Sequence, residues 1–304
     1  MATTKHTVAV IGGSGMLGKH IVTGLLENGH YDVTILSRKG SDESKLAAFV
    51  TKGAKIAPVD YESQEDLVSA LKGQEIVIST VGAAALAEQP KYIEAAKAAG
   101  VRRFVPSEFG LDSGAPGVRE YFPALGYKYA TRDALLASGL EYTFVITGFF
   151  LETQFTSLFF WDVPGGKVTV KGDTTQPFTV TSLVDIGRWT AAALRDPASK
   201  NATVYLVGEN LTYDDAIKTV EAATGKTLEV TRESKADLEA AIAAAPNLWA
   251  SFLDLLLRAI SDGRGLTVEK DKAWNSQHHH HHHHKQLRSL ATWAPTASFQ
   301  AADA

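Results

Sequence analysis

The chain contains no cysteine. This absence excludes disulfide bonds, a thiolate nucleophile, and any metal or iron–sulfur site that depends on cysteine ligands. It is compatible with a reducing compartment, and a cytoplasmic location is expected. The first residues also lack the long apolar core of a secretory signal peptide.

Long apolar runs and an excess of basic residues are missing as well. No apolar stretch reaches the roughly 20 residues that a membrane-spanning helix needs, so no membrane association is expected. The formal net charge is −4 and the isoelectric point is about 6.2, which gives nucleic-acid binding no electrostatic support. A small molecule is therefore the expected partner, and the sequence leaves a monomer and a homodimer both open.

What is present is an ordinary globular composition. Hydrophobic residues make up 45% and charged residues 21% of the 304 residues. This balance is typical of a folded domain and argues against disorder of the whole chain. The length suits one large α/β domain, or such a domain with a smaller lobe.

The first half of the chain alternates short apolar runs with amphipathic helical patterns. The predicted strands are residues 8–11, 33–37, 55–59, 75–80, 103–106 and 142–146. The predicted helices are residues 16–27, 64–71, 89–99 and 127–137, each closed by a glycine within two residues. This alternation predicts βαβ units, and therefore an α/β fold with a Rossmann-type, doubly wound parallel sheet.

The alternation loosens after Gly148. Predicted strands at 167–171 and 203–207 stand among predicted helices at 184–194, 213–223, 236–244 and 248–260. We therefore expect a Rossmann-type domain over residues 1–150. Residues 151–304 are expected to form a smaller substrate-binding lobe, with some elements returning to the main sheet.

Residues 278–284 are seven consecutive histidines. They are either an affinity tag or a natural low-complexity insertion, and twenty residues follow them, which is unusual for a tag. The run is expected to be an exposed, flexible loop with incidental affinity for nickel or zinc. No physiological metal site is predicted.

A glycine-rich loop follows the first predicted strand. It reads Gly-Gly-Ser-Gly-Met-Leu-Gly over residues 12–18. Between a strand and a helix, the first glycine of such a triplet permits a tight turn, the second lets the backbone approach a pyrophosphate, and the third allows close helix packing. The amino end of the helix also favours phosphate through its N–H groups and its dipole. The expected cofactor-binding residues are Gly12, Ser14, Gly15, Met16, Leu17 and Gly18; a tight turn without a ligand is the alternative.

A basic residue stands where NAD-preferring proteins usually place an acid. Arg38 lies twenty residues after Gly18, at the end of the second predicted strand. An acid would repel a 2′-phosphate, whereas a guanidinium can hold it with two hydrogen bonds. Arg38 and Lys39 therefore predict NADP(H), with Lys45 as a further candidate cation. A solvated basic turn is the alternative, and it has more weight for Lys39 and Lys45.

Two further strand ends carry cofactor candidates, because ligands of open α/β sheets bind beyond the carboxyl ends of the strands. Asp60 ends the third predicted strand and is a candidate for the adenine amino group. Thr80, Val81 and Gly82 end the fourth, where small residues let a cofactor lie across the sheet. For Asp60, a loop carboxylate that faces water is the alternative.

The Tyr-x-x-x-Lys pair of short-chain dehydrogenases is absent, because no tyrosine has a lysine four residues later. The chain instead carries Ile-Ser-Thr-Val-Gly at 78–82, Pro-Ser-Glu-Phe-Gly at 106–110, Lys-Tyr-Ala-Thr-Arg at 128–132 and Gly-Leu-Glu-Tyr-Thr at 139–143. Together with the glycine loop, these motifs resemble the isoflavone reductase-like branch of the NmrA-like family, an atypical short-chain dehydrogenase group. The resemblance covers about residues 7 to 225 and is most specific at Pro-Ser-Glu-Phe-Gly and the lysine that follows.

The resemblance implies a catalytic lysine. In the family it lies downstream of Pro-Ser-Glu-Phe-Gly, and Lys128 takes that place here. A partly buried lysine beside a nicotinamide has a lowered pKa, which lets it exchange protons near neutral pH, and it can also bond the nicotinamide ribose. A lysine on a helix surface is the structural alternative. Tyr127 and Tyr129 flank Lys128, and at most one of them is expected to assist it.

The end of the fifth predicted strand lies near the expected nicotinamide. Ser107, Glu108 and Phe109 stand there, with Phe109 a candidate for stacking on the ring and Glu108 either a ligand contact or a loop anchor. The resemblance also places Phe149 and Phe150 beside substrate and nicotinamide. Most of the aromatic residues between 155 and 161 are expected to be core.

Two functions remain in competition. The leading hypothesis is an NADPH-dependent oxidoreductase that reduces a small aromatic substrate of the isoflavone, lignan or quinone type. The rival is an NADP(H)-binding redox sensor of the NmrA type without turnover, against which Lys128 argues. A nucleotide-sugar epimerase or dehydratase is disfavoured by the missing Tyr-x-x-x-Lys, and the sequence does not name the substrate.

Overall fold

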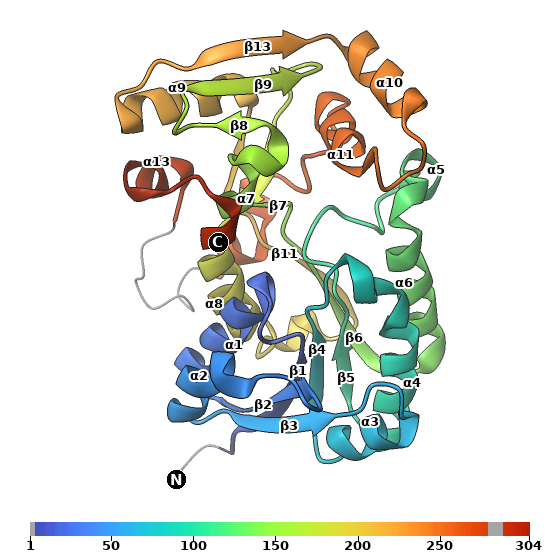
Figure 1. Cartoon of the computed structure of the whole chain (residues 1–304). Coiled ribbons are helices and arrows are strands. Elements are labelled where there is room, and N and C mark those ends of the chain that lie inside the picture. Colours follow the sequence, from blue (N-terminus) through green and yellow to red (C-terminus); the bar gives the residue numbers. More distant parts are fainter. Residues whose placement is uncertain (1–3, 279–287) are drawn as a thin grey trace. The chain divides into compact units, whose positions relative to one another are not determined.

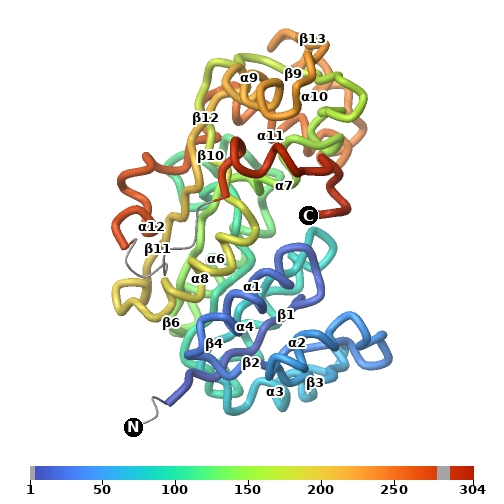
Figure 2. The backbone as a smooth tube through the Cα atoms, turned by 90° about the vertical axis from the view of Figure 1, so that its left-hand side faces the viewer, coloured from blue at the N-terminus to red at the C-terminus, as the bar shows by residue number. Residues whose placement is uncertain are grey.

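A computed structural model of the chain describes residues 4–278 and 288–304. Figures 1 and 2 trace their elements from two directions. The chain divides into two compact units: the first comprises the chain up to Phe109, Leu125–Val145 and Ile186–Val204, and the second comprises Gly110–Ala124, Ile146–Asp185 and the chain from Tyr205. Residues 186–204 thus return from the second half of the chain to the first unit.

A seven-stranded sheet forms the centre of the first unit (Figure 1). Its strands, in spatial order, are β3 (Lys55–Val59), β2 (Tyr31–Arg38), β1 (His6–Ile11), β4 (Ile76–Ser79), β5 (Arg103–Val105), β6 (Glu141–Ile146) and β11 (Ala202–Tyr205). Neighbouring strands from β3 to β6 are parallel. The order reverses between β1 and β4, as in doubly wound Rossmann sheets. The predicted α/β fold class is confirmed.

Three helices cover one face of this sheet. They are α3 (Gln64–Leu71), α4 (Gln89–Ala99) and α6 (Gly126–Ser138), with α3 packed on α4 and α4 on α6. Alternate residues of the strands point to this face, because successive side chains of a strand point to opposite faces. The buried cluster beneath the helices includes Ala9, Ile11, Val77, Phe104, Leu67 and Leu135.

Two further helices, α1 (Met16–Asn28) and α8 (Leu183–Ala193), cross at a pair of glycines. A Cβ atom on Gly24 would lie 2.2 Å from the carbonyl oxygen of Gly187, and one on Gly187 would lie 2.0 Å from the carbonyl oxygen of His20. The two backbones approach this closely only because both positions lack a side chain. The Tyr31 hydroxyl, on β2, also donates to the Ala191 carbonyl at 2.6 Å. These contacts fasten the returning segment to the first unit.

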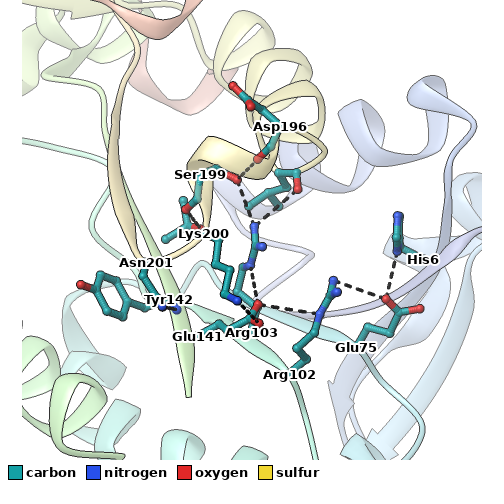
Figure 3. Close-up of polar contacts among 12 residues, drawn as sticks. His6, Glu75, Arg102, Arg103, Glu141, Tyr142, Asp196, Ser199, Lys200 and Asn201 are labelled. Carbon is teal, nitrogen blue, oxygen red and sulfur yellow. Dashed lines mark hydrogen bonds and ion pairs between the residues drawn. The ribbon is translucent and has the colours of Figure 1, made fainter. Parts of the chain in front are cut away.

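Charged side chains gather at the amino ends of β4, β5 and β6 (Figure 3). Arg103 is only 5% exposed, its Nε lies 3.5 Å from Glu141 Oε2, and its Nη1 donates to Ser199 Oγ at 3.0 Å. Burial lowers the pKa of the Arg103 guanidinium, and the Glu141 carboxylate opposes this effect. Further ion pairs extend the network through Arg102, Glu75, His6 and Lys200. This network lies at the edge of the sheet opposite the one where ligands bind.

Two three-stranded sheets form the second unit. In the first, β10 (Phe178–Thr181) lies between β12 (Glu209–Leu211) and β7 (Phe149–Phe150); in the second, β9 (Lys167–Lys171) lies between β13 (Glu229–Glu233) and β8 (Trp161–Asp162). Each central strand has one parallel and one antiparallel neighbour. Figure 2 shows β9 and β13 close to α9 and α10 in this unit.

The core of the second unit is rich in aromatic side chains. Phe155, Trp161 and Phe178 are fully buried, and the rings of Phe155 and Trp161 meet edge to face at 5.1 Å. The helices of the second unit are α5 (Val118–Tyr121), α7 (Leu151–Gln154), α9 (Tyr213–Thr224), α10 (Lys235–Ala244), α11 (Phe252–Ser261), α12 (Trp274–Gln277) and α13 (Leu290–Trp293). Among the helices of residues 4–278 and 288–304, none has both the length and the apolarity that crossing a membrane requires.

The last segment of the chain packs into the second unit. Leu290 and Phe299 belong to its buried core, at 1% and 4% exposure. The backbone N–H of Arg288 donates to Asp185 Oδ2 at 3.0 Å, and that of Leu290 donates to Glu209 Oε1 at 2.7 Å. Residues 279–284 of the histidine run, and with them the prediction of a flexible loop, lie outside the described residues.

The predicted elements of the first half agree with the observed ones within two residues at each end. In the second half, the predicted helix at 248–260 begins later, at Phe252, because residues 247–250 form a turn in which Asn247 Oδ1 accepts the N–H of Ala250. The strands β7, β8, β10, β12 and β13 were not predicted. Each has at most five residues, and none lies in the regular alternation of strands and helices that revealed the equally short β5 in the first half.

Candidate cofactor and catalytic site

The glycine loop follows β1 and leads into α1. Gly12 has a positive φ of 84°, which favours glycine, and a Cβ atom there would lie 2.9 Å from Thr80 Oγ1. A Cβ atom on Gly18 would lie 1.9 Å from the Gly12 carbonyl oxygen. The first turn of α1 therefore packs directly on the backbone of the loop, and neither glycine tolerates a side chain. A Cβ atom on Gly13, a residue without a predicted role, would lie 2.8 Å from Ile35 Cγ2.

The amino end of α1 is open. Ser14, Gly15 and Met16 are exposed, whereas Leu17 and Gly18 are buried. Gly15 is the N-cap residue of the helix, with an extended backbone, and as a glycine it has no side chain that could bond the first N–H groups. A Cβ atom on Gly15 would meet only the Gly12 carbonyl, at 3.3 Å. An anionic pyrophosphate fits this end of the helix, because the dipole and the N–H groups both favour negative charge.

The cations predicted to select NADP(H) lie at the end of β2 in different environments. Arg38 is exposed, and its guanidinium lies 5.7 Å from the ring centroid of Tyr61, which was not predicted as part of the site. Lys39 pairs with Asp66, with Nζ 3.3 Å from Oδ2. Lys45 is exposed in the short helical turn Glu43–Leu46. Of the three cations, Lys39 thus shares its charge with a carboxylate, and a contact of Arg38 with a 2′-phosphate stays a prediction.

Asp60 has a local role in the turn after β3. Its Oδ1 accepts the N–H of Glu62 at 3.0 Å, and its own N–H donates to Asp66 Oδ2 at 2.6 Å. The backbone N–H of Asp60 is also the largest cause that lowers the pKa of Asp66. These bonds are those of a loop carboxylate, and a contact with adenine stays a prediction.

The ends of β4 and β5 are joined by Ser107. Its hydroxyl donates to the Val81 carbonyl at 2.9 Å, and its N–H donates to Oε1 of the fully buried Gln89 at 2.8 Å. Gln89 carries no motif, so only the three-dimensional contact identifies it. Thr80 Oγ1 donates to the Ile11 carbonyl at 2.7 Å, and a side chain on Gly82 would meet open space.

Lys128 lies on the first turn of α6. Its Nζ donates to the carbonyl oxygen of Glu108 at 2.7 Å. Burial lowers the pKa of the Lys128 ammonium; the Glu108 carboxylate opposes this effect, and the Arg132 guanidinium adds to it. The structure thus brings Lys128 to the Pro-Ser-Glu-Phe-Gly motif, twenty residues earlier in the chain.

Glu108 and Phe109 hold unusual positions. The Glu108 carboxylate is buried, and its Oε1 lies 3.7 Å from Arg132 Nε. Phe109 is buried with a positive φ of 36°, and its N–H donates to the Val145 carbonyl at 2.9 Å. A left-handed backbone is costly for a bulky residue and is found mainly at functional sites. Stacking of Phe109 on a nicotinamide stays a prediction.

The remaining candidates differ in exposure. Tyr127 is 45% exposed on α6, whereas Tyr129 is buried. In the second unit, Phe149 is buried, with its ring edge-to-face against Phe159 at 5.8 Å, and Phe150 is half-buried. The described residues contain no group of three or more side chains arranged to hold a metal ion.

A doubly wound sheet with this glycine loop defines a dinucleotide-binding α/β protein. The absence of a Tyr-x-x-x-Lys pair from the sequence separates it from typical short-chain dehydrogenases. The chain matches the model of the NmrA-like family over residues 4–255.

Curated relatives and solved structures agree with this match. Isoflavone reductase homolog IRL of Zea mays is 35% identical over 240 residues, 75% of this chain and 77% of that protein. Eugenol synthase 1 of Petunia hybrida is 35% identical over 239 residues, 74% of this chain and 77% of that protein. The structure of AtPrR2 with NADP+ and (+)pinoresinol has a TM-score of 0.83 at 27% identity and covers 97% of this chain and 99% of its own.

The chain therefore belongs to the NmrA-like family, in its isoflavone reductase-like branch of NADP(H)-dependent reductases. This assignment confirms the family, the enzyme class and the cofactor predicted from the sequence.

Proposed function

We propose that this chain reduces a small aromatic substrate of the isoflavone, lignan or quinone type, and that Lys128 is its acid–base residue. The observation that carries the proposal is the hydrogen bond from Lys128 Nζ to the Glu108 carbonyl, together with the lowered pKa of that ammonium. A lysine with a lowered pKa exchanges protons closer to neutral pH than an exposed one does.

The cofactor-binding residues support this assignment. The loop at Gly12, Gly15 and Gly18 and the open amino end of α1 suit a pyrophosphate, and Arg38 suits a 2′-phosphate. We assign Ser107, Glu108, Phe109 and the 80–82 segment to the nicotinamide half on the strand-end argument. When bound, NADPH supplies the hydride for the reduction.

Lys128 is held in a way that suits proton transfer. An ammonium carries three N–H donors, and the bond to the Glu108 carbonyl uses one of them. The side chain is thus oriented by one donor while another serves the substrate. Because a reduction by hydride adds negative charge to the substrate, a proton from Nζ completes the addition.

The substrate class rests on relatives. They include a eugenol synthase and a phenylcoumaran benzylic ether reductase, and a similar solved structure holds (+)pinoresinol. We propose that the second unit is the substrate-binding lobe and that Phe149 and Phe150 contact the aromatic substrate. Phe150 is the more accessible of the two, because Phe149 packs against Phe159 and Phe178.

The first prediction tests Lys128 directly. Oxidation of NADPH, followed at the nicotinamide absorbance, is measured across a panel of isoflavones, lignans, phenylpropenes and quinones. In Lys128→Ala, we expect kcat to fall about a hundredfold or more, the scale of general acid–base catalysis, while NADPH binding is kept. Lys97→Ala, which changes an exposed lysine on α4, is the matched control. Unchanged turnover in Lys128→Ala would remove the lysine from the mechanism.

The same experiments separate the enzyme from a regulatory protein. A redox sensor would bind NADP+ and NADPH with similar affinity and oxidise NADPH with no compound of the panel. That combined result would replace the reductase assignment by the sensor assignment.

A further inference from the structure

We propose that Arg132 is a positioning residue for Lys128. Arg132 pairs with the buried Glu108 carboxylate and thereby controls the proton affinity of Lys128. This inference rests on the proposed role of Lys128. Arg132 stands in the Lys-Tyr-Ala-Thr-Arg motif, and no role was predicted for it from the sequence.

Glu108 connects the two cations through different atoms. Its backbone carbonyl accepts the Lys128 ammonium at 2.7 Å, and its carboxylate Oε1 lies 3.7 Å from Arg132 Nε. Lys128 and Arg132 are one helical turn apart on α6, so both side chains point to the same side of the helix. One residue of the Pro-Ser-Glu-Phe-Gly motif is therefore held between two cations of one helix.

Arg132 is fixed where it lies. Its side chain is only 11% exposed, and its guanidinium carbon lies 3.8 Å from the ring centroid of Phe144 on β6. A guanidinium stacks on an aromatic face and binds a carboxylate at its edge, which an ammonium does less well. The contact with Phe144 therefore sets the position from which Arg132 meets Glu108.

The Glu108 carboxylate needs this partner. Its side chain is 2% exposed, and a buried carboxylate is costly unless it is paired. Without the guanidinium, the full negative charge of Glu108 would act on the adjacent ammonium. Pairing with Arg132 offsets that charge while the Glu108 carbonyl still orients Lys128.

The charged groups that act on the Lys128 ammonium are Glu108, from the segment after β5, and Arg132, from α6 itself. Helix α4 also packs on α6. Its charged residues Lys91, Glu94 and Lys97 are exposed, so solvent screens them. Glu88, which ends the helical turn before α4, pairs with Lys91 at 3.0 Å. Burial has the largest effect on the pKa of Lys128, and Glu108 and Arg132 are the charged residues that adjust it further.

The expected signs follow from these charges. Removing the Arg132 cation takes away a charge that disfavours protonated Lys128 and leaves the Glu108 anion without its partner. Both changes raise the pKa of Lys128. Removing the Glu108 charge has the opposite effect. Whether Lys128 acts as acid or base, the limb of the pH–rate profile that it controls must move in the direction of its pKa.

The second prediction is measured on that limb. The limb is identified as the one that Lys128→Arg abolishes. In Arg132→Met, we expect it to move to higher pH by about one unit, the usual effect of one close charge, and Arg132→Lys to restore most of the shift. In Glu108→Gln, we expect it to move to lower pH. Arg188→Met, which breaks the exposed pair with Glu27, is the matched control and leaves the limb in place.

A second readout is independent of turnover. In protein labelled at lysine Cε with carbon-13, the signal missing from Lys128→Arg reports the titration of Lys128 by NMR. It should titrate at higher pH in Arg132→Met. A guanidinium that only stabilises the fold would lower the melting temperature in Arg132→Met but leave both the limb and the NMR titration unchanged, and this result would overturn the inference.

The two proposals fail in different ways. If Lys128→Ala retains full activity, the proposed role of Lys128 fails and the kinetic limb has another origin. If Lys128→Ala is inactive while Arg132→Met leaves the titration of Lys128 where it was, only the inference about Arg132 fails.

Discussion

The basic residues after β2 differ in their contacts. Lys39 is paired with Asp66, whereas Arg38 is exposed beside the ring of Tyr61. The sequence showed three cations within eight residues, Arg38, Lys39 and Lys45, and could not rank them by contact. The pairing depends on Asp66, which lies in the first turn of another element, α3. Asp66 comes near Lys39 only because β2 and β3 are neighbours in the sheet.

The third prediction concerns Arg38. In Arg38→Glu, we expect the KM for NADPH to rise about tenfold to a hundredfold, because a charge-assisted bond is lost and a repulsive charge is introduced. The KM for NADH should change little or fall. Steady-state kinetics with both cofactors measure this, and Lys52→Glu, on the exposed end of α2 (Ala47–Thr51), is the charge-matched control. Equal losses with both cofactors would contradict a contact with the 2′-phosphate.

At the scale of elements, periodicity revealed the long helices and glycine marked their ends. The predicted helix at 64–71 coincides with α3, whose amino end is capped by Ser63. The strands β7 and β8 were not revealed. They have two residues each, and their strand conformation depends on hydrogen bonds to β10 and β9. The crossing of α1 and α8 was equally hidden, because a glycine inside a helical pattern does not say what lies against it.

The fourth prediction tests that crossing. In Gly24→Ala, we expect the free energy of unfolding to fall by about 2 kcal/mol, because the new Cβ atom would collide with the backbone of α8 unless one helix moves. A urea titration followed by circular dichroism measures the loss. Gly126→Ala, in α6, is the matched control: a Cβ there meets nothing within 4 Å, so it should be neutral or slightly stabilising. Equal effects of the two substitutions would show that α1 and α8 separate at little cost.

At the scale of the whole molecule, the chain does not fill its two compact units in sequence. Residues 110–124 belong to the second unit, and residues 186–204 belong to the first. Residues 288–304 are also a folded part of the second unit, since Leu290, Ala294 and Phe299 are buried in its core. No helix was predicted in this segment, because α13 has only four residues and the contacts of the segment are with residues distant in the chain.

The fifth prediction tests the contribution of this segment. In Leu290→Ala, we expect a loss of about 3 kcal/mol of unfolding free energy, as for a leucine removed from a packed core. Leu136→Ala removes the same atoms from a side chain that is 51% exposed, and it should change stability by less than about 0.5 kcal/mol. Thermal and urea unfolding compare the two variants. A loss no larger in Leu290→Ala than in Leu136→Ala would show that the segment is dispensable for the fold.

Local periodicity and short motifs were enough to predict the doubly wound fold, the glycine loop, NADP(H) as the cofactor and the family. Tertiary structure alone decided the partners: Asp66 on Lys39, Gln89 on Ser107, and Glu108 between Lys128 and Arg132. Packing also decided which of the aromatic residues between 155 and 161 are core: Phe155, Phe159 and Trp161 are buried, whereas Phe160 is exposed. These outcomes depend on contacts between residues far apart in the chain, and burial and charge pairing at such contacts arise only when the elements have packed.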